Sequence, residues 1–395
     1  MTCNPDKNQI YLKQTYVRRP RKMIYLDYAA SAPPYEECTG LVSRVMGSAY
    51  GNPGALHCAG ADARKLLQQS RRELAALLGV GDREIFFTSG GTEANNWAVK
   101  LGCRCVTGTE LLVSATEHKS VLEAAYAMEA QGYRVKLLYP DSTGRIDPEE
   151  TDRLLEPNSA MLCVQAVNNE TGTLQDVEAL ARVAKKHRVP FLCDAVQSFG
   201  HLKLPLHKAD FVTLSAHKFG GPRGIGCLVA RYPYLPGPLL HGGGQELGLR
   251  SGTENLPGIA GMALAARLSV ESLSPETFRL QRLSALLLDG LRQADPGLSV
   301  NGSDRRHPGI LNCSFSGISG EELTMRLDLL GICVSPGAAC AARDTKPSHV
   351  LLAMGAEGSR AKNAVRFSLG RNTTEEEIRQ TVRAVETILC SRKES

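Results

Sequence analysis

The sequence has no long hydrophobic run. None of its segments reaches the roughly 18 consecutive apolar residues that a membrane-spanning helix needs. The first 22 residues also lack the apolar core of a secretory signal peptide. We therefore expect a cytoplasmic protein with no membrane partner. Met23 is a second plausible start of the chain.

Regular cysteine spacing is also lacking. The 12 cysteines are scattered over 395 residues, which disfavours a disulfide framework and favours a reducing compartment. The cysteines of CRC (103–105) have no second pair at metal-site spacing, so we expect no metal. The one dense basic cluster, RRPRK (18–22), is more typical of a solvated terminal arm than of a nucleic-acid interface. We expect no direct nucleic-acid partner.

Length and composition favour a soluble enzyme with more than one hydrophobic core. The chain has 43% hydrophobic and 22% charged residues, and its length exceeds that of most single-core domains. Between about residues 57 and 230, helical patterns alternate with short apolar runs, namely LLVSA (111–115), RVKLL (134–138), AMLCVQAV (160–167), FLCDA (191–195), FVTLS (211–215) and GCLVA (226–230). This alternation predicts a mostly parallel sheet covered by helices.

The pattern changes after about residue 272. Two long helical stretches lead into short strands and a last helix, which begins with a capping box formed by Thr374 and Glu377. This part predicts a smaller α+β domain. We expect a large domain from residues 35–272 and a small domain from residues 1–34 and 273–395.

Asp194 and Lys218 form the strongest candidate pair. Each follows a predicted strand, at the edge of the sheet where α/β proteins bind ligands. Enzymes that use pyridoxal 5'-phosphate (PLP) need a lysine to form a Schiff base and a carboxylate to keep the pyridine nitrogen protonated. Either residue alone is more often a surface lysine or an ordinary strand-end aspartate. Together with the motifs below, they predict a PLP site.

The segment TSGGTEANN (88–96) predicts a phosphate-binding turn. Its glycines lie between a strand and a helix, where backbone N–H groups and the helix dipole favour an anion. Gly91 and Thr92 are the expected donors, and Ser215 and His217 are placed to complete the phosphate site. A lone glycine turn of this kind is weak evidence, because many strand–helix connections have one.

Three further polar residues follow predicted strands. His118 is a candidate for stacking on the cofactor ring and moving protons, although a single histidine is more often structural. Asn169 and Gln197 are candidates for hydrogen bonds to the phenolic oxygen of the cofactor. For Asn169 the alternative is an ordinary turn asparagine.

Nine ordered segments carry a resemblance to a known family. They are YLDYAASAP, FTSGGTEANN, TEHKSVL, NNETG, DAVQS, SAHKFGGPRGIG, HGGGQELGLRSGTEN, PGAAC with KPSHVL, and VRFSLGRNTTEEE. Their order and spacing over residues 23–390 resemble the NifS/IscS-like cysteine desulfurases, which are class V aminotransferase-type PLP enzymes. The resemblance implies the aspartate aminotransferase-like fold (fold type I), with a seven-stranded, mostly parallel sheet and a small α+β domain.

The resemblance also implies residue roles. Lys218 matches the Schiff-base lysine, Asp194 the partner of the pyridine nitrogen, and His118 the stacking acid/base. Arg366 matches the arginine that binds the substrate carboxylate, a bidentate role suited to a guanidinium; the alternative is a strand arginine paired with an acid. Asn169 lies beside both substrate and cofactor. Thr253 matches a residue that reaches the phosphate of the other subunit. A homodimer with shared active sites is implied.

Cys340 matches the catalytic cysteine of the family. The resemblance implies that L-cysteine is converted to L-alanine while its sulfur passes to Cys340 as a persulfide and then to an acceptor protein. An exposed loop cysteine, on a loop of about residues 335–348, can ionise and move as this role requires. Relatives often carry hydroxyl residues around this cysteine, whereas here Ala339 and Ala341 flank it and Pro336 stiffens the base of the loop.

The acceptor and two alternative functions stay open. The chain stops at ETILCSRKES, without the longer tail by which some relatives bind the iron–sulfur scaffold. We therefore expect an iron–sulfur scaffold and a tRNA-thiolation enzyme about equally as the protein that receives the sulfur. The alternatives are a selenocysteine lyase with the same Lys218 and Asp194, and a catalytically weak sulfur-relay or partner-binding homologue.

Overall fold

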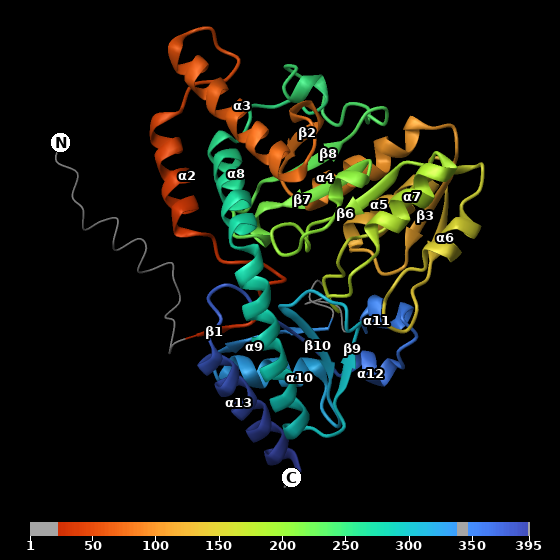
Figure 1. The fold of residues 1–395 in the computed structure, drawn as a ribbon, viewed down its shortest axis with the longest axis vertical. Helices are drawn as coiled ribbons and strands as arrows, with labels where there is room; N and C mark the ends of the chain where they lie inside the picture. The colour runs from red at the N-terminus through yellow and green to blue at the C-terminus, as the bar shows by residue number, and fades with distance from the viewer. Residues whose placement is uncertain (1–22, 338–346, 394–395) are drawn as a thin grey trace, which may run out of the picture.

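The described part of the computed structural model contains a seven-stranded sheet, a four-stranded sheet and a separate two-stranded pair, and two consecutive long helices run between the two larger sheets (Figure 1). The structure describes residues 23–337 and 347–393. Cys340, Ala339 and Ala341 lie outside the described residues. No helix in the described part of the chain is long and apolar enough to cross a membrane.

The larger sheet has seven strands in the order β2-β8-β7-β6-β5-β3-β4. All its strands run parallel except β8, which is antiparallel to both neighbours. This confirms the predicted fold class. The strands are β2 (Ile85–Thr88), β3 (Glu110–Ser114), β4 (Arg134–Leu138), β5 (Ser159–Cys163), β6 (Phe191–Asp194), β7 (Phe211–Ser215) and β8 (Gly226–Ala230).

Helices cover both faces of this sheet, so its central strands are apolar on both sides. Helices α2, α3, α7 and α8 share one hydrophobic core with the sheet, and α4 and α5 share another. Gly79 ends α3 in a left-handed conformation (φ 69°), as its position in the sequence predicted. The helices are α2 (Glu36–Ser48), α3 (Cys58–Leu78), α4 (Gly91–Trp97), α5 (Lys119–Glu129), α6 (Pro148–Leu154), α7 (Val177–His187) and α8 (Leu256–Glu271).

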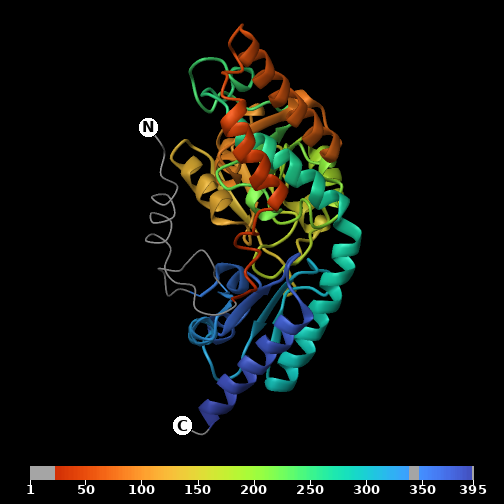
Figure 2. The same ribbon diagram turned by 90° about the vertical axis from the view of Figure 1, so that its left-hand side faces the viewer.

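The smaller sheet is antiparallel, with the order β12-β13-β10-β9. Its strands are β9 (Ser299–Asn301), β10 (Ile310–Ser314), β12 (Ser335–Pro336) and β13 (Ala364–Ser368); β1 (Ile24–Tyr25) pairs separately with β11 (Ile332–Cys333). The helices are α9 (Leu273–Ala294), α10 (Gly320–Leu329), α11 (His349–Ala353), α12 (Gly358–Lys362) and α13 (Glu375–Lys393). Figure 2 shows α9 and α13 along one side of this sheet.

One sequence expectation about this part was wrong, and one was correct. Between residue 272 and the short strands there is one long helix, α9, whereas the other long helix expected there, α8, lies before residue 272. The capping box is present, because Thr374 N donates to Glu377 Oε2 (2.9 Å) and Glu377 N donates to Thr374 Oγ1 (3.2 Å). We keep the domain boundary at residues 272 and 273 as a proposal.

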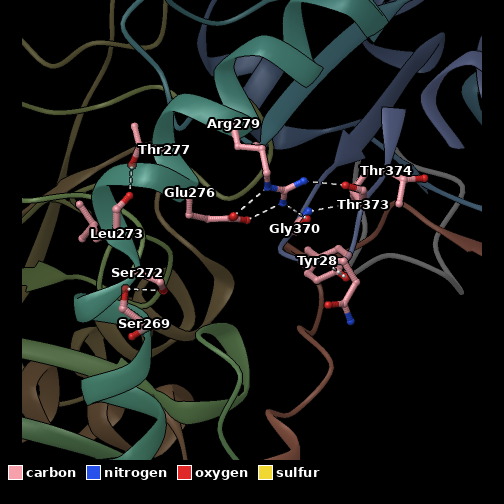
Figure 3. Close-up of polar contacts among 12 residues, drawn as sticks. Tyr28, Ser269, Ser272, Leu273, Glu276, Thr277, Arg279, Gly370, Thr373 and Thr374 are labelled. Carbon is pink, nitrogen blue, oxygen red and sulfur yellow. Dashed lines mark hydrogen bonds and ion pairs between the residues drawn. The ribbon is translucent and has the colours of Figure 1, made fainter. Parts of the chain in front are cut away.

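Arg279 ties the start of α9 to the turn that follows β13 (Figure 3). Its guanidinium donates to the carbonyl oxygens of Thr373 (2.6 Å) and Gly370 (2.8 Å) and is held in place by Glu276 (2.7 and 2.9 Å). Gly370 must lack a side chain, because a Cβ atom there would lie 2.0 Å from the ring of Tyr28. These contacts fix the strand that carries Arg366.

Candidate active site

A cavity of about 250 Å³ opens at the carboxyl ends of the large-sheet strands. This is the edge at which α/β sheets bind ligands. Ten of the twelve predicted site residues line it, namely Gly91, Thr92, His118, Asn169, Asp194, Gln197, Ser215, His217, Lys218 and Arg366. Nine of them come from the large sheet and the loops after its strands, and Arg366 comes from β13.

Lys218 lies in a 3₁₀ turn directly after β7. Its Nζ donates to the backbone carbonyl oxygens of Ala29 (2.7 Å) and Ala30 (3.1 Å), both of which line the cavity. Gln197 Nε2 donates to the same Ala29 oxygen at 2.7 Å. The segment before α2 therefore holds two of the predicted cofactor-binding side chains at the wall of the cavity.

Asp194 ends β6 and is almost fully buried. Its Oδ1 accepts a hydrogen bond from Val196 N (2.9 Å), and its Oδ2 accepts one from Asn95 Nδ2 (2.8 Å). Hydrogen bonds of this kind stabilise a carboxylate in a buried position. The carboxyl group is thus fixed against the cavity by two donors.

His118 caps the N-terminus of α5. Its Nδ1 accepts a hydrogen bond from Ser120 N (3.1 Å) and lies 2.8 Å from Ser120 Oγ. Burial lowers the pKa of His118, and the positive charge of Lys218 lowers it further, while Asp194 opposes the shift. His118 is therefore neutral near pH 7.

The predicted phosphate site is built by close packing around glycine. A Cβ atom on Gly91 would lie 2.8 Å from Val196 Cγ2, and one on Gly226 of β8 would lie 2.7 Å from Gly90 Cα. Ser215 and His217 line the same cavity, and His217 Nδ1 lies 3.2 Å from Ser31 Oγ. Burial, Lys218 and Arg223 lower the pKa of His217 to about 4. A neutral His217 can donate to an anion without a charge of its own.

Arg366 is 1% exposed and lies at the small-sheet side of the cavity. Its Nη1 donates to Asn169 O (2.8 Å), and its Nη2 pairs with Asp27 Oδ1 (2.8 Å). Its Nε is buried without a hydrogen-bond partner among the described residues. An unpaired buried N–H is costly, so an anionic group such as a carboxylate that reached this atom would be stabilised by it.

Glu170 lies beside this arginine in the loop after β5. It is buried and bonded to Ser348 Oγ, while its backbone oxygen accepts from Asn312 Nδ2 (3.1 Å). Burial raises the pKa of Glu170 to about 7, although Ser348 and Arg366 both act to lower it. The loop thus connects the cavity to the small sheet and to the start of α11.

Among the described site residues, Thr253 does not line the cavity. Thr253 is exposed and lines a separate hollow of about 90 Å³ with Ser89 and Arg250. Cys340 lies outside the described residues, but both flanking segments are described. Ser335 pairs with Arg366 in the small sheet, and His349 Nε2 lies 3.0 Å from Glu117 O, next to His118.

Sequence reasoning missed several polar groups of the site. Asn95 and Ser120 connect Asp194 to His118, and Asp27 is the ion-pair partner of Arg366. Asn95 had a weak sequence signal. It lies four residues after Gly91 on the same helix, and residues four apart share a helix face.

Comparison with known proteins identifies the family. The aminotransferase class-V family matches residues 24–381. The chain belongs to this family, among the cysteine desulfurases. A cysteine desulfurase IscS from Anaeromyxobacter dehalogenans is 39% identical over 91% of each chain. One from Dictyoglomus turgidum is 34% identical over 93% of this chain and 95% of the relative. The solved structure of a NifS-like protein covers 93% of this chain and 100% of its own, with 34% identity and a TM-score of 0.88.

Class-V aminotransferase-type cysteine desulfurases are PLP-dependent in general. The residues at the cavity fit that group, because the chain supplies a lysine, a fixed buried carboxylate, a glycine-lined turn and an unpaired guanidinium N–H around one space.

Proposed function

We propose that the protein is a PLP-dependent cysteine desulfurase that transfers sulfur from L-cysteine to Cys340. The observation that carries the proposal is the single cavity lined by Lys218, Asp194, His118 and Arg366. In the net step the Cβ–S bond of cysteine breaks and a bond to Cys340 Sγ forms. Cβ gains a proton, so the products are L-alanine and an enzyme persulfide, with no external oxidant or reductant.

The cofactor would be held by groups from several strands. Lys218 Nζ would attach it covalently, Asp194 would pair with the pyridine nitrogen, and Gln197 would face its phenolic oxygen. Backbone N–H groups at Gly91 and Thr92, with Ser215 and His217, would bind the phosphate. When bound, PLP withdraws electrons from the substrate and so makes its Cα–H acidic.

The substrate carboxylate would bind Arg366. Its Nε is unpaired, and its other contacts to Asn169 O and Asp27 keep the guanidinium in place. Asn169 lines the cavity beside it and would contribute to binding both substrate and cofactor. A positioned guanidinium places the amino acid with its Cα near Lys218 and His118.

Lys218 and His118 would move the protons. The Lys218 amine, once released from the cofactor, would take the proton from Cα and return it at Cβ or Cα. His118 lines the same cavity and is neutral near pH 7, the state in which its ring can accept a proton.

Cys340 would receive the sulfur, and an acceptor protein would remove it. Both segments flanking Cys340 contact residues at or next to the cavity, which supports its assignment. A structural neighbour titled SspA in complex with cysteine, 32% identical with a TM-score of 0.78, supports the substrate. Thr253 is exposed and away from the cavity, which supports the proposal that it completes the site of a second subunit in a homodimer. An iron–sulfur scaffold and a tRNA-thiolation enzyme are equal candidates for the acceptor.

The proposal is tested by incubating the protein with cysteine and identifying the persulfidated residue by mass spectrometry while alanine is quantified. We expect alanine and a 32-dalton addition on Cys340 (the mass of one sulfur atom). Cys340→Ser should still bind PLP and cysteine but release no sulfide under reducing conditions. Cys58→Ser, at an exposed cysteine, is the matched control and should behave like the wild type. Wild-type sulfide release by Cys340→Ser would remove Cys340 from the mechanism.

A further inference from the structure

Asn95 connects two parts of the site through a buried side-chain amide. It is 1% exposed and lies in α4. Its Nδ2 donates one hydrogen to Asp194 Oδ2 (2.8 Å) and the other to Ser120 Oγ (2.9 Å), while its Oδ1 accepts from Thr213 Oγ1 (2.7 Å). Turning the amide over would place Oδ1 against the carboxylate of Asp194. The orientation of Asn95 is therefore fixed.

This orientation determines how Ser120 meets His118. Ser120 Oγ accepts a hydrogen from Asn95, so its own hydroxyl hydrogen is directed to the other near neighbour, His118 Nδ1, at 2.8 Å. Ser120 N donates to the same Nδ1 at 3.1 Å. An imidazole nitrogen that accepts from two donors carries no proton, so the proton of the neutral ring lies on Nε2.

We propose that Asn95 and Ser120 are positioning residues that select the Nε2–H tautomer of His118 and fix its ring relative to Asp194. The catalytic meaning of this inference rests on the proposed function, whereas the hydrogen-bond pattern does not. His118 then presents an N–H donor from Nε2, and it gains a second proton at Nδ1 only when the Ser120 hydroxyl turns away. The Asn95 amide thus helps to orient both Asp194, the proposed partner of the pyridine nitrogen, and His118, the proposed acid/base.

The charges around His118 agree with a neutral ring. Asp194 on β6 favours the protonated form. Burial is the largest opposing effect, and Lys218 after β7, His349 at the start of α11 and Lys119 on α5 add to it, so the net result lowers the pKa of His118. Tautomer selection therefore concerns the form that is populated near pH 7.

The test is ¹⁵N NMR of the full-length protein labelled at histidine, as purified and after removal of the cofactor, with His118→Gln used for assignment. We expect the ¹⁵N shifts of His118 to report the Nε2–H tautomer. In Ser120→Ala the pKa of His118 should rise by about 0.5 to 1 unit, because one of the two donors to the neutral ring is lost. The preference for the Nε2–H tautomer should weaken, because only Ser120 N still donates to Nδ1. Asn95→Leu should also mix the tautomers, since the Ser120 hydroxyl is then free to turn.

The neighbouring Asn96 provides the matched control. Its Nδ2 donates to the backbone oxygens of Thr92 (3.0 Å) and Ser120 (3.4 Å), not to the side chains of Asp194, Ser120 or His118. Asn96→Ala should leave the tautomer and the pKa of His118 unchanged. If Asn95→Leu does not fold, Ser120→Ala still decides the question.

The outcomes separate this inference from the proposed function. An Nδ1–H tautomer in the wild type, or an unchanged His118 titration in Ser120→Ala, overturns the positioning role even if the enzyme makes alanine from cysteine. An Nε2–H tautomer that responds to Ser120→Ala supports the positioning role even if no alanine forms, in which case the desulfurase proposal fails by itself.

Discussion

The two sides of the cavity differ in how completely their polar groups are paired. On the large-sheet side, both carboxylate oxygens of Asp194 accept hydrogen bonds, and Lys218 Nζ donates to two carbonyls. On the small-sheet side, Arg366 keeps an unpaired buried Nε; next to it, in the loop after β5 and outside the cavity lining, the buried Glu170 has its pKa raised to about 7. The first side is preorganised, and the second is electrostatically incomplete.

This difference fits two kinds of ligand. A resident cofactor benefits from groups that are fixed before it binds, because they need no reorganisation. A substrate that enters and leaves at every turnover benefits from a group whose pairing is completed only on binding. Variants that change one side of the cavity and leave the other intact test whether the two sides have these separate roles.

Lys218→Ala should have the largest effect, on the cofactor side. Activity should fall by more than about 10³-fold, since loss of one positioned proton-transfer group costs roughly 10² to 10⁴-fold and the covalent attachment is lost as well. Absorption spectra should lose the visible band of the attached cofactor. After borohydride reduction, intact-protein mass spectrometry should find the cofactor's mass on the wild type and not on the variant.

The exposed Lys203 supplies the control, because Lys203→Ala removes a lysine that is not part of the cavity lining. Its spectrum should match that of the wild type. A retained visible band in Lys218→Ala would contradict the assignment of the attachment site.

Arg366→Lys should have the next largest effect, confined to the substrate side. It keeps a positive charge near Asp27 but lacks the Nε–H and the planar fork. The KM for cysteine should rise by about 30-fold or more, as loss of a buried charged hydrogen bond costs roughly 2 kcal/mol or more. PLP affinity should stay within about threefold of wild type, because a loss of about 0.6 kcal/mol or less is expected on the cofactor side.

Arg279→Lys is the matched control for this variant, since Arg279 also anchors the small sheet but lies outside the cavity lining. An unchanged KM in Arg366→Lys would mean that another group binds the substrate carboxylate. A large loss of PLP affinity in it would mean that the two sides are not independent.

Much of the fold was predictable because local patterns and packing agree. The runs at 134–138, 211–215 and 226–230 are β4, β7 and β8 with the predicted bounds. The run at 160–167 ends as a strand at Cys163, four residues early. Beyond Cys163 the chain still donates to β6 through Ala166 N (2.9 Å to Asp194 O), but Gln165 N donates to the buried Glu117 carboxyl (2.7 Å), a contact that periodicity cannot reveal.

The candidate site likewise contains residues that the sequence could predict and residues that it could not. Asp194, Ser215 and Asn169 were predictable because strand ends converge at one edge of a parallel sheet. The pairing of Asp27 with Arg366 joins residues 339 positions apart and depends on how the chain's first described strand crosses to the small sheet. To predict the role of Asn95, one would need to know how α4 is rotated about its axis relative to β6. Such long-range contacts come from tertiary packing and leave no local pattern.

The smallest expected effect is a pH-dependent change in stability at Glu170. The carboxyl of Glu170 has its pKa raised from 4.5 to about 7, so between these values the folded state holds a proton that the unfolded state releases. Stability from this group is therefore present below about pH 4.5 and is lost as the pH rises through 7, by at most roughly 3 kcal/mol. Glu170→Gln keeps an uncharged partner for Ser348, and urea midpoints should show the variant gaining stability relative to wild type from pH 5 to pH 8. A constant difference over that range would place the Glu170 carboxyl among ordinary, well-solvated groups and remove it from the incomplete side of the cavity.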